Sequence, residues 1–182
     1  MNLKSTKADS ALKIADHMYQ FAFSKKNDKY SARALNLKGV CLSVLNRNTE
    51  ALNAYRSSLK IYSSVKDTLG IITENNNIGI LYNKSGKTKE ALDIYKENQK
   101  LSRIISDTLS MACSNINMAF LLEMDNYDSS EILIYKANEL AKNIDNDYES
   151  FAFTNYILGY YNFRKISSEK AFFVDMPHLS YG

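Results

Sequence analysis

The chain has 182 residues with a formal net charge of +3, and 45% of its residues are hydrophobic. Its only proline is Pro177, which leaves residues 1–176 free to be helical almost throughout, and nothing in the composition indicates a sheet. The charge is unevenly spread, since residues 1–70 carry 12 basic and 5 acidic side chains while residues 111–150 carry 2 and 8. We therefore expect an all-α domain with a basic part and an acidic part.

The basic part does not indicate a nucleic-acid-binding protein, because its lysines are spread over helical faces without a compact run or a recognition motif. A solvated face is the simpler interpretation. Lys4, Lys7 and Asp9 stand where a signal peptide needs an apolar run, and no segment approaches the roughly eighteen apolar residues of a membrane span. We expect a cytoplasmic chain with no nucleic-acid partner and no membrane segment, unless it belongs to a larger protein.

Apolar residues at helical spacing predict a series of helices from the start of the chain. The first, at about 5–24, carries a stripe that includes Ala8, Ala11 and Ala15. A polar turn follows, in which Asn27 or Asp28 can cap the next helix. The later helices are expected at 29–46, 49–65, 68–84, 89–105, 108–124, 129–143 and 148–165.

Acidic residues mark the starts of several of these helices. Asp67, Asp107 and Asp147 each precede an apolar run, where a side-chain oxygen can accept hydrogen bonds from free backbone N–H groups. Asp128 and Glu131 have the spacing of a capping box before the helix at 129–143. These aspartates are therefore interpreted as structural and not catalytic.

The end of the chain breaks the helical pattern. Pro177 should stop a short last helix near Val174 and leave residues 175–182 as an irregular tail. Without a complete partner, the helix at 148–165 should keep an apolar face, which a missing helix, the tail or a second copy could cover.

Four series of residues recur at a step of forty. The series are Gly39, Gly79, Ala119 and Gly159; Tyr55, Tyr95 and Tyr135; Ala11, Ala51, Ala91, Glu131 and Ala171; and the triplets that begin at Asp67, Asp107 and Asp147. A fixed period between about 20 and 50 residues indicates stacked structural repeats. The array should occupy residues 1–174, with a half repeat at 5–24, repeats at 29–65, 68–105 and 108–143, and a partial repeat at 148–174.

Within one period the segment Asn75-x2-Ile78-Gly79-x2-Tyr82, followed by Ala91-x3-Tyr95, resembles the tetratricopeptide (TPR) pattern. The resemblance implies an α-solenoid of antiparallel helix pairs, wound as a right-handed superhelix. The step of forty resembles the longer TPR variety of kinesin light chains, bacterial peptide-pheromone receptors and, above all, the sensor regions of bacterial TPR histidine kinases and regulators. It implies a non-enzymatic interaction module that senses or scaffolds in bacterial signalling.

In this family the first helix of each repeat lines a concave wall, where a peptide or a segment of a partner protein binds. The resemblance places the following residues at or beside that wall: Arg33, Asn36, Asn76, Asn77, Ile80, Asn83, Asn117, Phe120, Tyr156 and Tyr160. Ile116 also falls on a wall position. An asparagine amide donates and accepts at once, so a row of amides suits the backbone of an extended chain.

Two alternatives stay open at this point. The asparagines can instead cap their own helices or bond between adjacent repeats. The whole module can also be a self-associating or structural element, whose groove is filled by a second copy or by its own tail.

Motifs for chemistry are weak. Ser85-Gly86-Lys87-Thr88 looks like the end of a phosphate-binding loop, but it follows a helix and lacks the earlier glycine. His17 and His178 have no ligand partners at metal spacing, and Cys41 and Cys113 are expected to be free thiols in helices of different repeats. We expect no enzyme activity, no metal and no cofactor.

Overall fold

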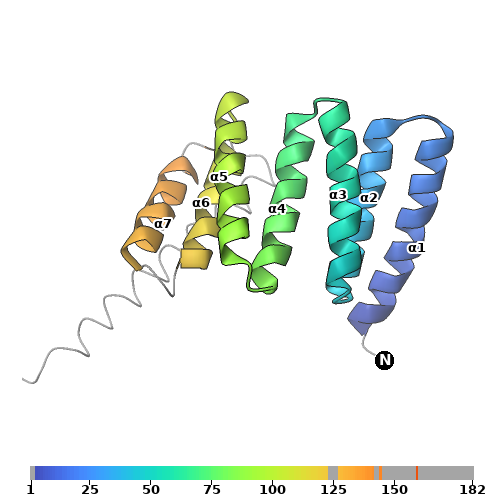
Figure 1. Cartoon of the computed structure of the whole chain (residues 1–182), viewed down its shortest axis with the longest axis horizontal. Helices are drawn as coiled ribbons and strands as arrows, with labels where there is room; N and C mark the ends of the chain where they lie inside the picture. Colours follow the sequence, from blue (N-terminus) through green and yellow to red (C-terminus); the bar gives the residue numbers. More distant parts are fainter. Residues whose placement is uncertain (1–2, 123–126, 142–143, 145–158, 160–182) are drawn as a thin grey trace, which may run out of the picture. The chain divides into compact units, whose positions relative to one another are not determined.

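The computed structural model describes residues 3–122, 127–141, 144 and 159. Within them the chain forms seven α-helices and no strand (Figure 1): α1 (Leu3–Ser24), α2 (Asp28–Val44), α3 (Asn48–Ser64), α4 (Thr68–Lys84), α5 (Thr88–Ile104), α6 (Thr108–Leu122) and α7 (Tyr127–Ala141). The predicted all-α helical repeat solenoid is confirmed. The helix expected at 148–165 and the tail at 175–182 lie outside the described residues, apart from Gly159, which is helical.

The chain divides into two compact units, Met1–Ser106 and Asp107–Gly182. In the first unit each helix from α1 to α4 packs on the next one along the chain, and α2 also touches α4 (Figure 1). In the second unit α6 packs on α7. We call α2, α4 and α6 the A helices and α1, α3, α5 and α7 the B helices; the A helices begin at Asp28, Thr68 and Thr108.

One type of turn joins successive helices in the first unit. The second residue after each helix end has a positive φ, and these residues are Lys26, Asn46, Lys66, Gly86 and Ser106. In the turn after α2, the Asn46 N–H donates to the Ser43 carbonyl and the Arg47 N–H to the Leu42 carbonyl, at 3.1 and 2.9 Å. This pair of bonds is the Schellman motif, which satisfies carbonyls that a helix end would otherwise leave free.

The A helices have side-chain caps, as the sequence indicated. Asn27 accepts from the Tyr30 N–H, Asp67 from the Gly70 N–H and Asp107 from the Ser110 N–H. The capping box predicted before α7 is wrong, because α7 already begins at Tyr127 and Asp128 lies inside its first turn. There its carboxylate still interacts favourably with the positive end of the helix dipole.

The A and B helices of a repeat contact each other through two recurring pairs. A Cβ built on Gly39 would lie 2.5 Å from the Tyr55 ring, and one on Gly79 would lie 2.7 Å from the Tyr95 ring, so only glycine admits these tyrosines. The second pair is polar. Ser58 Oγ donates to the Ala32 carbonyl at 2.9 Å, and forty residues later Asn98 Nδ2 donates to the Ile72 carbonyl at 3.0 Å.

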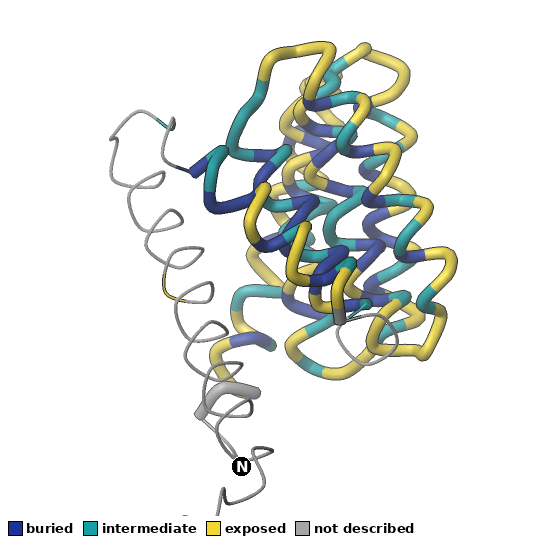
Figure 2. The backbone as a smooth tube through the Cα atoms, turned by 90° about the vertical axis from the view of Figure 1, so that its left-hand side faces the viewer, coloured by how far each residue is buried: buried dark blue, intermediate teal, exposed yellow. Residues whose placement is uncertain are grey.

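Each unit has its own apolar core. In Figure 2 the buried positions are the dark blue parts of the tube. The core of the first unit contains Leu42, Ala51, Ala54, Tyr55, Ile78 and Leu81, with Tyr82 packed against it. The core of the second unit contains Ala112, Ile116, Ala119, Ile134, Ala137 and Ala141. Ile116, which the repeat pattern placed on the wall, is therefore a core residue.

In α7 the forty-residue series does not predict which residues are buried. Ile134 is 2% exposed and packs in the core, whereas Tyr135 is 53% exposed. Glu131 is exposed too, while Ser130 is buried and donates to the Ala119 carbonyl at 3.0 Å. Because α7 starts one residue earlier than α3 and α5 do relative to their A helices, its inward face consists of residues one position earlier than the series predicts.

Candidate functional site

Side chains on α2 and α4 form a continuous exposed or half-exposed stripe, at the helical spacing of three and four residues. We call it the α2–α4 surface. Its residues are Lys29, Arg33, Asn36 and Val40 on α2, and Leu69, Thr73, Asn76, Ile80 and Asn83 on α4. Of the residues predicted at the wall, it contains Arg33, Asn36, Asn76, Ile80 and Asn83.

One end of this surface is a pocket of about 390 Å³. It is lined by Lys29, Arg33, Asn36, Tyr62, Asp67, Leu69, Gly70 and Thr73. Tyr62 forms its inner wall, since the ring is buried and lies directly against Gly70. A larger residue at position 70 would push this ring into the pocket.

The two cationic side chains that line the pocket differ in their partners. Lys29 Nζ lies 2.9 Å from an Asp67 carboxylate oxygen, and the Gly70 N–H and Lys29 together hold the pKa of Asp67 below its usual value. The Arg33 guanidinium is exposed and makes no hydrogen bond or ion pair within the described part of the chain. Arg33 is thus the cation of the pocket that is available to an anionic group.

A buried carboxyl group lies under the surface. Glu74 on α4 has no exposed area, and its Oε1 is 2.8 Å from both Asn36 Nδ2 and Ser58 Oγ. Its Oε2 is buried without a hydrogen bond of good geometry to any described residue. The repeat pattern did not predict this group, because the equivalent positions in the other repeats are Ala34 and Ser114.

Burial raises the pKa of Glu74 to about 7, although the side chains of Ser58, Asn36 and Asn77 act in the opposite direction. Ser58 Oγ has one proton and lies within bonding distance of both the Ala32 carbonyl and Glu74 Oε1, so it donates to only one of these two acceptors at a time.

The asparagine side chains predicted to bind a peptide already interact with other side chains of the protein. Asn36 bonds to Glu74, and Asn77 also interacts with it, while Asn76 Oδ1 accepts from Asn98 Nδ2 at 3.0 Å. Each bond uses only part of an amide, so Asn36 keeps one N–H and its oxygen, and Asn76 keeps both N–H groups. All three side chains remain half-exposed; the partners of Asn76 and Asn77 lie in the same repeat, and the partner of Asn36 lies in the next one.

The other predicted site residues are not brought to this surface by any described contact. Asn117 is half-buried and Phe120 is 37% exposed on α6, in the second unit. Tyr156 and Tyr160 lie outside the described residues.

The described residues contain no group of three or more His, Cys, Asp or Glu side chains that could hold a metal ion. None of the helices in this part of the chain is long and apolar enough to cross a membrane. Cys41 is buried and Cys113 half-buried, both as free thiols, and burial raises the pKa of Cys113 to about 12. Both sulfurs are therefore protonated and unreactive at neutral pH.

Comparison with known families agrees with this architecture. The profile of the tetratricopeptide repeat family matches residues 8–103, which is more than half of the chain. The chain belongs to the tetratricopeptide repeat family. Proteins of this family generally act as scaffolds for protein–protein interaction and are typically not catalytic.

Two solved structures share the fold. The crystal structure of BtubC (BKLC) from P. vanneervenii matches with a TM-score of 0.67 and 14% identity, over 97% of this chain and 78% of that one. The nearly identical TPR-like repeats of a protein from Podosopora anserina, designated a kinesin light chain, match with a TM-score of 0.54 and 12% identity, over 94% and 92%. No curated protein sequence is significantly similar to the chain.

Proposed function

We propose that the α2–α4 surface binds an extended segment of a partner protein, with an acidic group at Arg33 and an apolar side chain at Val40 and Ile80. The observation that carries this proposal is the exposed Arg33 guanidinium at a pocket of about 390 Å³, which has no hydrogen-bond or ion-pair partner among the described residues. A guanidinium in this position can take a carboxylate through two parallel hydrogen bonds.

The spacing of the surface defines the expected ligand. Val40 and Ile80 are each 40% exposed, and Val40 lies seven residues beyond Arg33 on α2. Seven residues of helix extend about 10 Å, which an extended peptide covers in about three residues. The preferred motif is therefore an acidic residue followed, or preceded, at the third position by an apolar one. The fixed amides of Asn36 and Asn76 lie between these anchors and can bond to the peptide backbone.

This binding mode suits the sensing or scaffolding part of a bacterial signalling or regulatory protein, as the resemblance to sensor regions implies. A surface that is already ordered by Glu74 and Asn98 loses little entropy when the peptide binds.

A peptide array tests the proposal. Peptides with Glu-x-x-Leu in both orientations, with matched Gln-x-x-Leu and Glu-x-x-Ser peptides, are probed with the complete chain. Arg33→Ala should abolish the preference for Glu over Gln, about fivefold or roughly 1 kcal/mol. Ile80→Ser should abolish the preference for Leu over Ser.

Arg103→Ala is the matched control, because Arg103 is exposed at the end of α5 in the same unit. This variant should keep both preferences. Equal binding of all peptides to the unaltered chain, or an equal effect of both arginine variants, would contradict the proposal.

A further inference from the structure

Two cationic side chains converge on Tyr82, near the end of α4. Arg56 on α3 donates a hydrogen bond through Nη2 to the Tyr82 hydroxyl oxygen at 2.9 Å. The Lys87 Nζ lies over the ring of the same tyrosine, 5.6 Å from its centre. Lys87 immediately precedes α5, so side chains from two helices and a turn meet at one point that is not part of the α2–α4 surface.

Arg56 has no carboxylate partner in the part of the chain that the structure describes. Forty residues earlier the same position is Asp16 on α1, whose carboxylate lies 2.7 Å from Lys38 Nζ on the next helix. The residue forty positions after Lys38 is Ile78, which is buried in the core of the first unit. The repeat pattern therefore supplies no counter-charge for Arg56.

Lys87 differs in the same way from its equivalent, Arg47. The Arg47 guanidinium lies 2.7 Å from the Glu50 carboxylate, three residues along the chain. Glu90 stands at the same spacing from Lys87, but the lysine amine lies over the tyrosine ring and forms no ion pair with any described residue. Residues 82–89 include three lysines and no acidic residue. The tyrosine hydroxyl is thus part of a locally positive surface.

The Tyr82 hydroxyl group still has a proton to donate. Its oxygen accepts from Arg56, and its own O–H has no acceptor among the described residues. The ring packs against the core of the first unit, which holds the hydroxyl group in place. The cluster therefore presents a guanidinium, a phenol and an ammonium group as hydrogen-bond donors, with two positive charges.

We propose that Arg56, Tyr82 and Lys87 bind a phosphate monoester, carried by a phosphorylated serine or threonine of a partner protein. Such a group has a charge of about −1.5 to −2 at neutral pH and three acceptor oxygens, which matches two cations and three donor groups. A carboxylate or a phosphodiester has a single negative charge and leaves one cation without a partner. The guanidinium can bond to two phosphate oxygens in parallel, while the ammonium group acts as a point charge.

The exposure of the cluster favours a phosphorylated side chain over a free phosphate ion. Arg56 and Lys87 are exposed and Tyr82 is half-buried, so the cluster lies at the surface. A free ion there keeps much of its hydration, whereas a peptide adds contacts on either side of the phosphate group. Protein partners are also usual for the tetratricopeptide repeat family.

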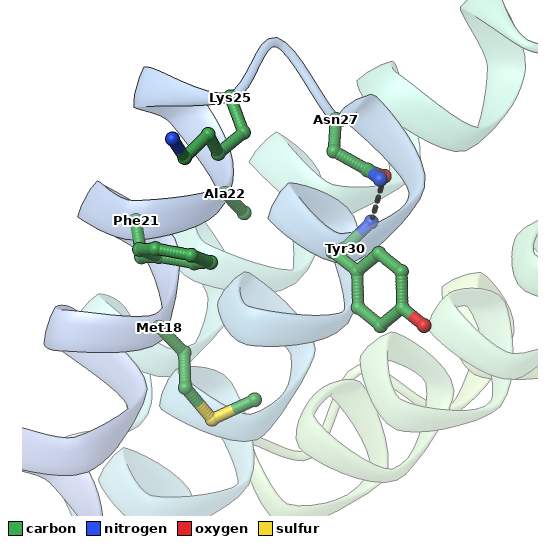
Figure 3. A pocket seen from close by; sticks show the side chains of 6 residues that line it. All are labelled: Met18, Phe21, Ala22, Lys25, Asn27 and Tyr30. Atoms are coloured by element: carbon green, nitrogen blue, oxygen red, sulfur yellow. Dashed lines mark hydrogen bonds between the residues drawn. The ribbon is translucent and has the colours of Figure 1, made fainter.

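A second lysine that lies over an aromatic ring has different surroundings. The Lys25 Nζ is 5.8 Å from the centre of the Phe21 ring, which has no hydroxyl group (Figure 3). The pocket of about 290 Å³ beside it is lined by Met18, Phe21, Ala22, Lys25, Asn27 and Tyr30. No other residue of this lining is cationic, and the Asn27 side-chain oxygen already accepts from the Tyr30 N–H (Figure 3). Lys25 is therefore a suitable control for Lys87.

Fluorescence anisotropy of a labelled phosphoserine peptide, with degenerate residues on either side, measures binding to the complete chain. The phosphopeptide should bind about fivefold more tightly than the same peptide with serine or glutamate in place of the phosphoserine. Arg56→Ala and Lys87→Ala should each weaken its binding about fivefold. Tyr82→Phe keeps the packed ring and removes only the hydroxyl group, and it should weaken binding about threefold.

Two further variants are matched controls. Lys25→Ala removes the other lysine that lies over a ring, and Arg33→Ala removes the available cation of the α2–α4 surface. Both should bind the phosphopeptide like the unaltered chain, because neither residue belongs to the cluster. The second control keeps the test independent of the function proposed for the α2–α4 surface.

Three results would overturn the proposal. The first is absence of binding, or equal binding of the phosphorylated and unphosphorylated peptides. The second is an equal loss in the Lys25→Ala and Arg56→Ala chains, which would indicate attraction to positive charge alone. The third is inorganic phosphate, or a single-stranded oligonucleotide, that binds as tightly as the phosphopeptide, since these probes represent the free ion and the phosphodiester.

Discussion

The ionisation of Glu74 is the residue-scale feature with the clearest consequence. The folded protein holds its pKa near 7, above the value of 4.5 for an unburied glutamic acid. Between these two pH values the folded state binds more protons than the unfolded state does, so the free energy of unfolding falls as pH rises. Glu74 therefore stabilises least above pH 7, where its buried carboxyl group must be charged.

Glu74→Gln should remove this dependence. The stability of the unaltered chain relative to the variant should fall by on the order of 1 to 3 kcal/mol between pH 5 and pH 8. Urea titrations at several pH values measure the difference. Glu97→Gln, at an exposed position on α5, is the control and should leave the pH dependence of the unaltered chain in place.

The glycine–tyrosine contact gives a second residue-scale prediction. Gly79→Leu places a side chain where a Cβ already lies 2.7 Å from the buried Tyr95 ring. Overpacking should lower the free energy of unfolding by about 1 to 3 kcal/mol, even though leucine favours a helix over glycine by about 1 kcal/mol. Asn83→Leu introduces the same side chain at an exposed position of α4 and should cost little. Equal losses in a denaturant titration would contradict the assignment of the two helix faces.

At the residue scale the sequence predicted packing better than polar contacts. Gly79 and Tyr95 were visible because both recur at the period. Glu74 was not, because a carboxyl group on the inward face of one repeat has no copy in the others. The bonds of Asn36 and Asn76 depend on which neighbours lie across the helix interface, and a repeat pattern does not contain that information.

At the scale of elements, the turns repeat more strictly than the helices do. Residues 26, 46, 66, 86 and 106 all have a positive φ, although only residue 86 is glycine. A residue with a Cβ pays about 1 kcal/mol or more for this conformation. Glycine at the four non-glycine turn positions should therefore raise the free energy of unfolding.

Opposite substitutions in two turns test this cost. Lys66→Gly should raise the free energy of unfolding by roughly 0.5 to 1 kcal/mol, and Gly86→Ala should lower it by about 1 kcal/mol. A Cβ on Gly86 meets no described atom within 4 Å, so the second effect comes from the backbone alone. Thermal unfolding by circular dichroism gives both values, and changes of the same sign would contradict the explanation.

The position of α7 shows why the inward face of a helix was harder to predict than the presence of the helix. Its predicted start was close, but α7 begins one residue nearer to the start of its A helix than α3 and α5 do, and this difference puts Ile134 instead of Tyr135 on the inward face. The glutamate at position 131 was the available signal, because the series has alanine at the equivalent buried positions 51 and 91.

At the scale of the whole molecule, the family profile covers residues 8–103 and so lies inside the first compact unit. Deletion of residues 48–87, which joins Arg47 to Thr88, should leave a folded chain. The new A–B pair is α2 with α5, and it keeps both contacts, Gly39 with Tyr95 and the Ala32 carbonyl with Asn98.

Circular dichroism and urea titration measure the result. The shortened chain should keep its ellipticity per residue at 222 nm and unfold in one cooperative step. Deletion of residues 48–67 is the control, because it places α4 directly after α2 and leaves Gly39 without a tyrosine. This chain should lose cooperativity, and similar behaviour of both deletions would contradict the pairing.

The uniform length of the turns also determines which residues of each helix face inward. A turn of constant length sets which side of the next helix faces inward, so one inserted or deleted residue shifts that choice by about 100°. The start of α7, one residue early relative to its A helix, is such a shift, and its inward face stays apolar because Ile134 stands at the new inward position. Insertions and deletions in this chain should therefore be tolerated when they comprise whole repeats. A single inserted or deleted residue should be tolerated only where a neighbouring apolar side chain can take the inward position.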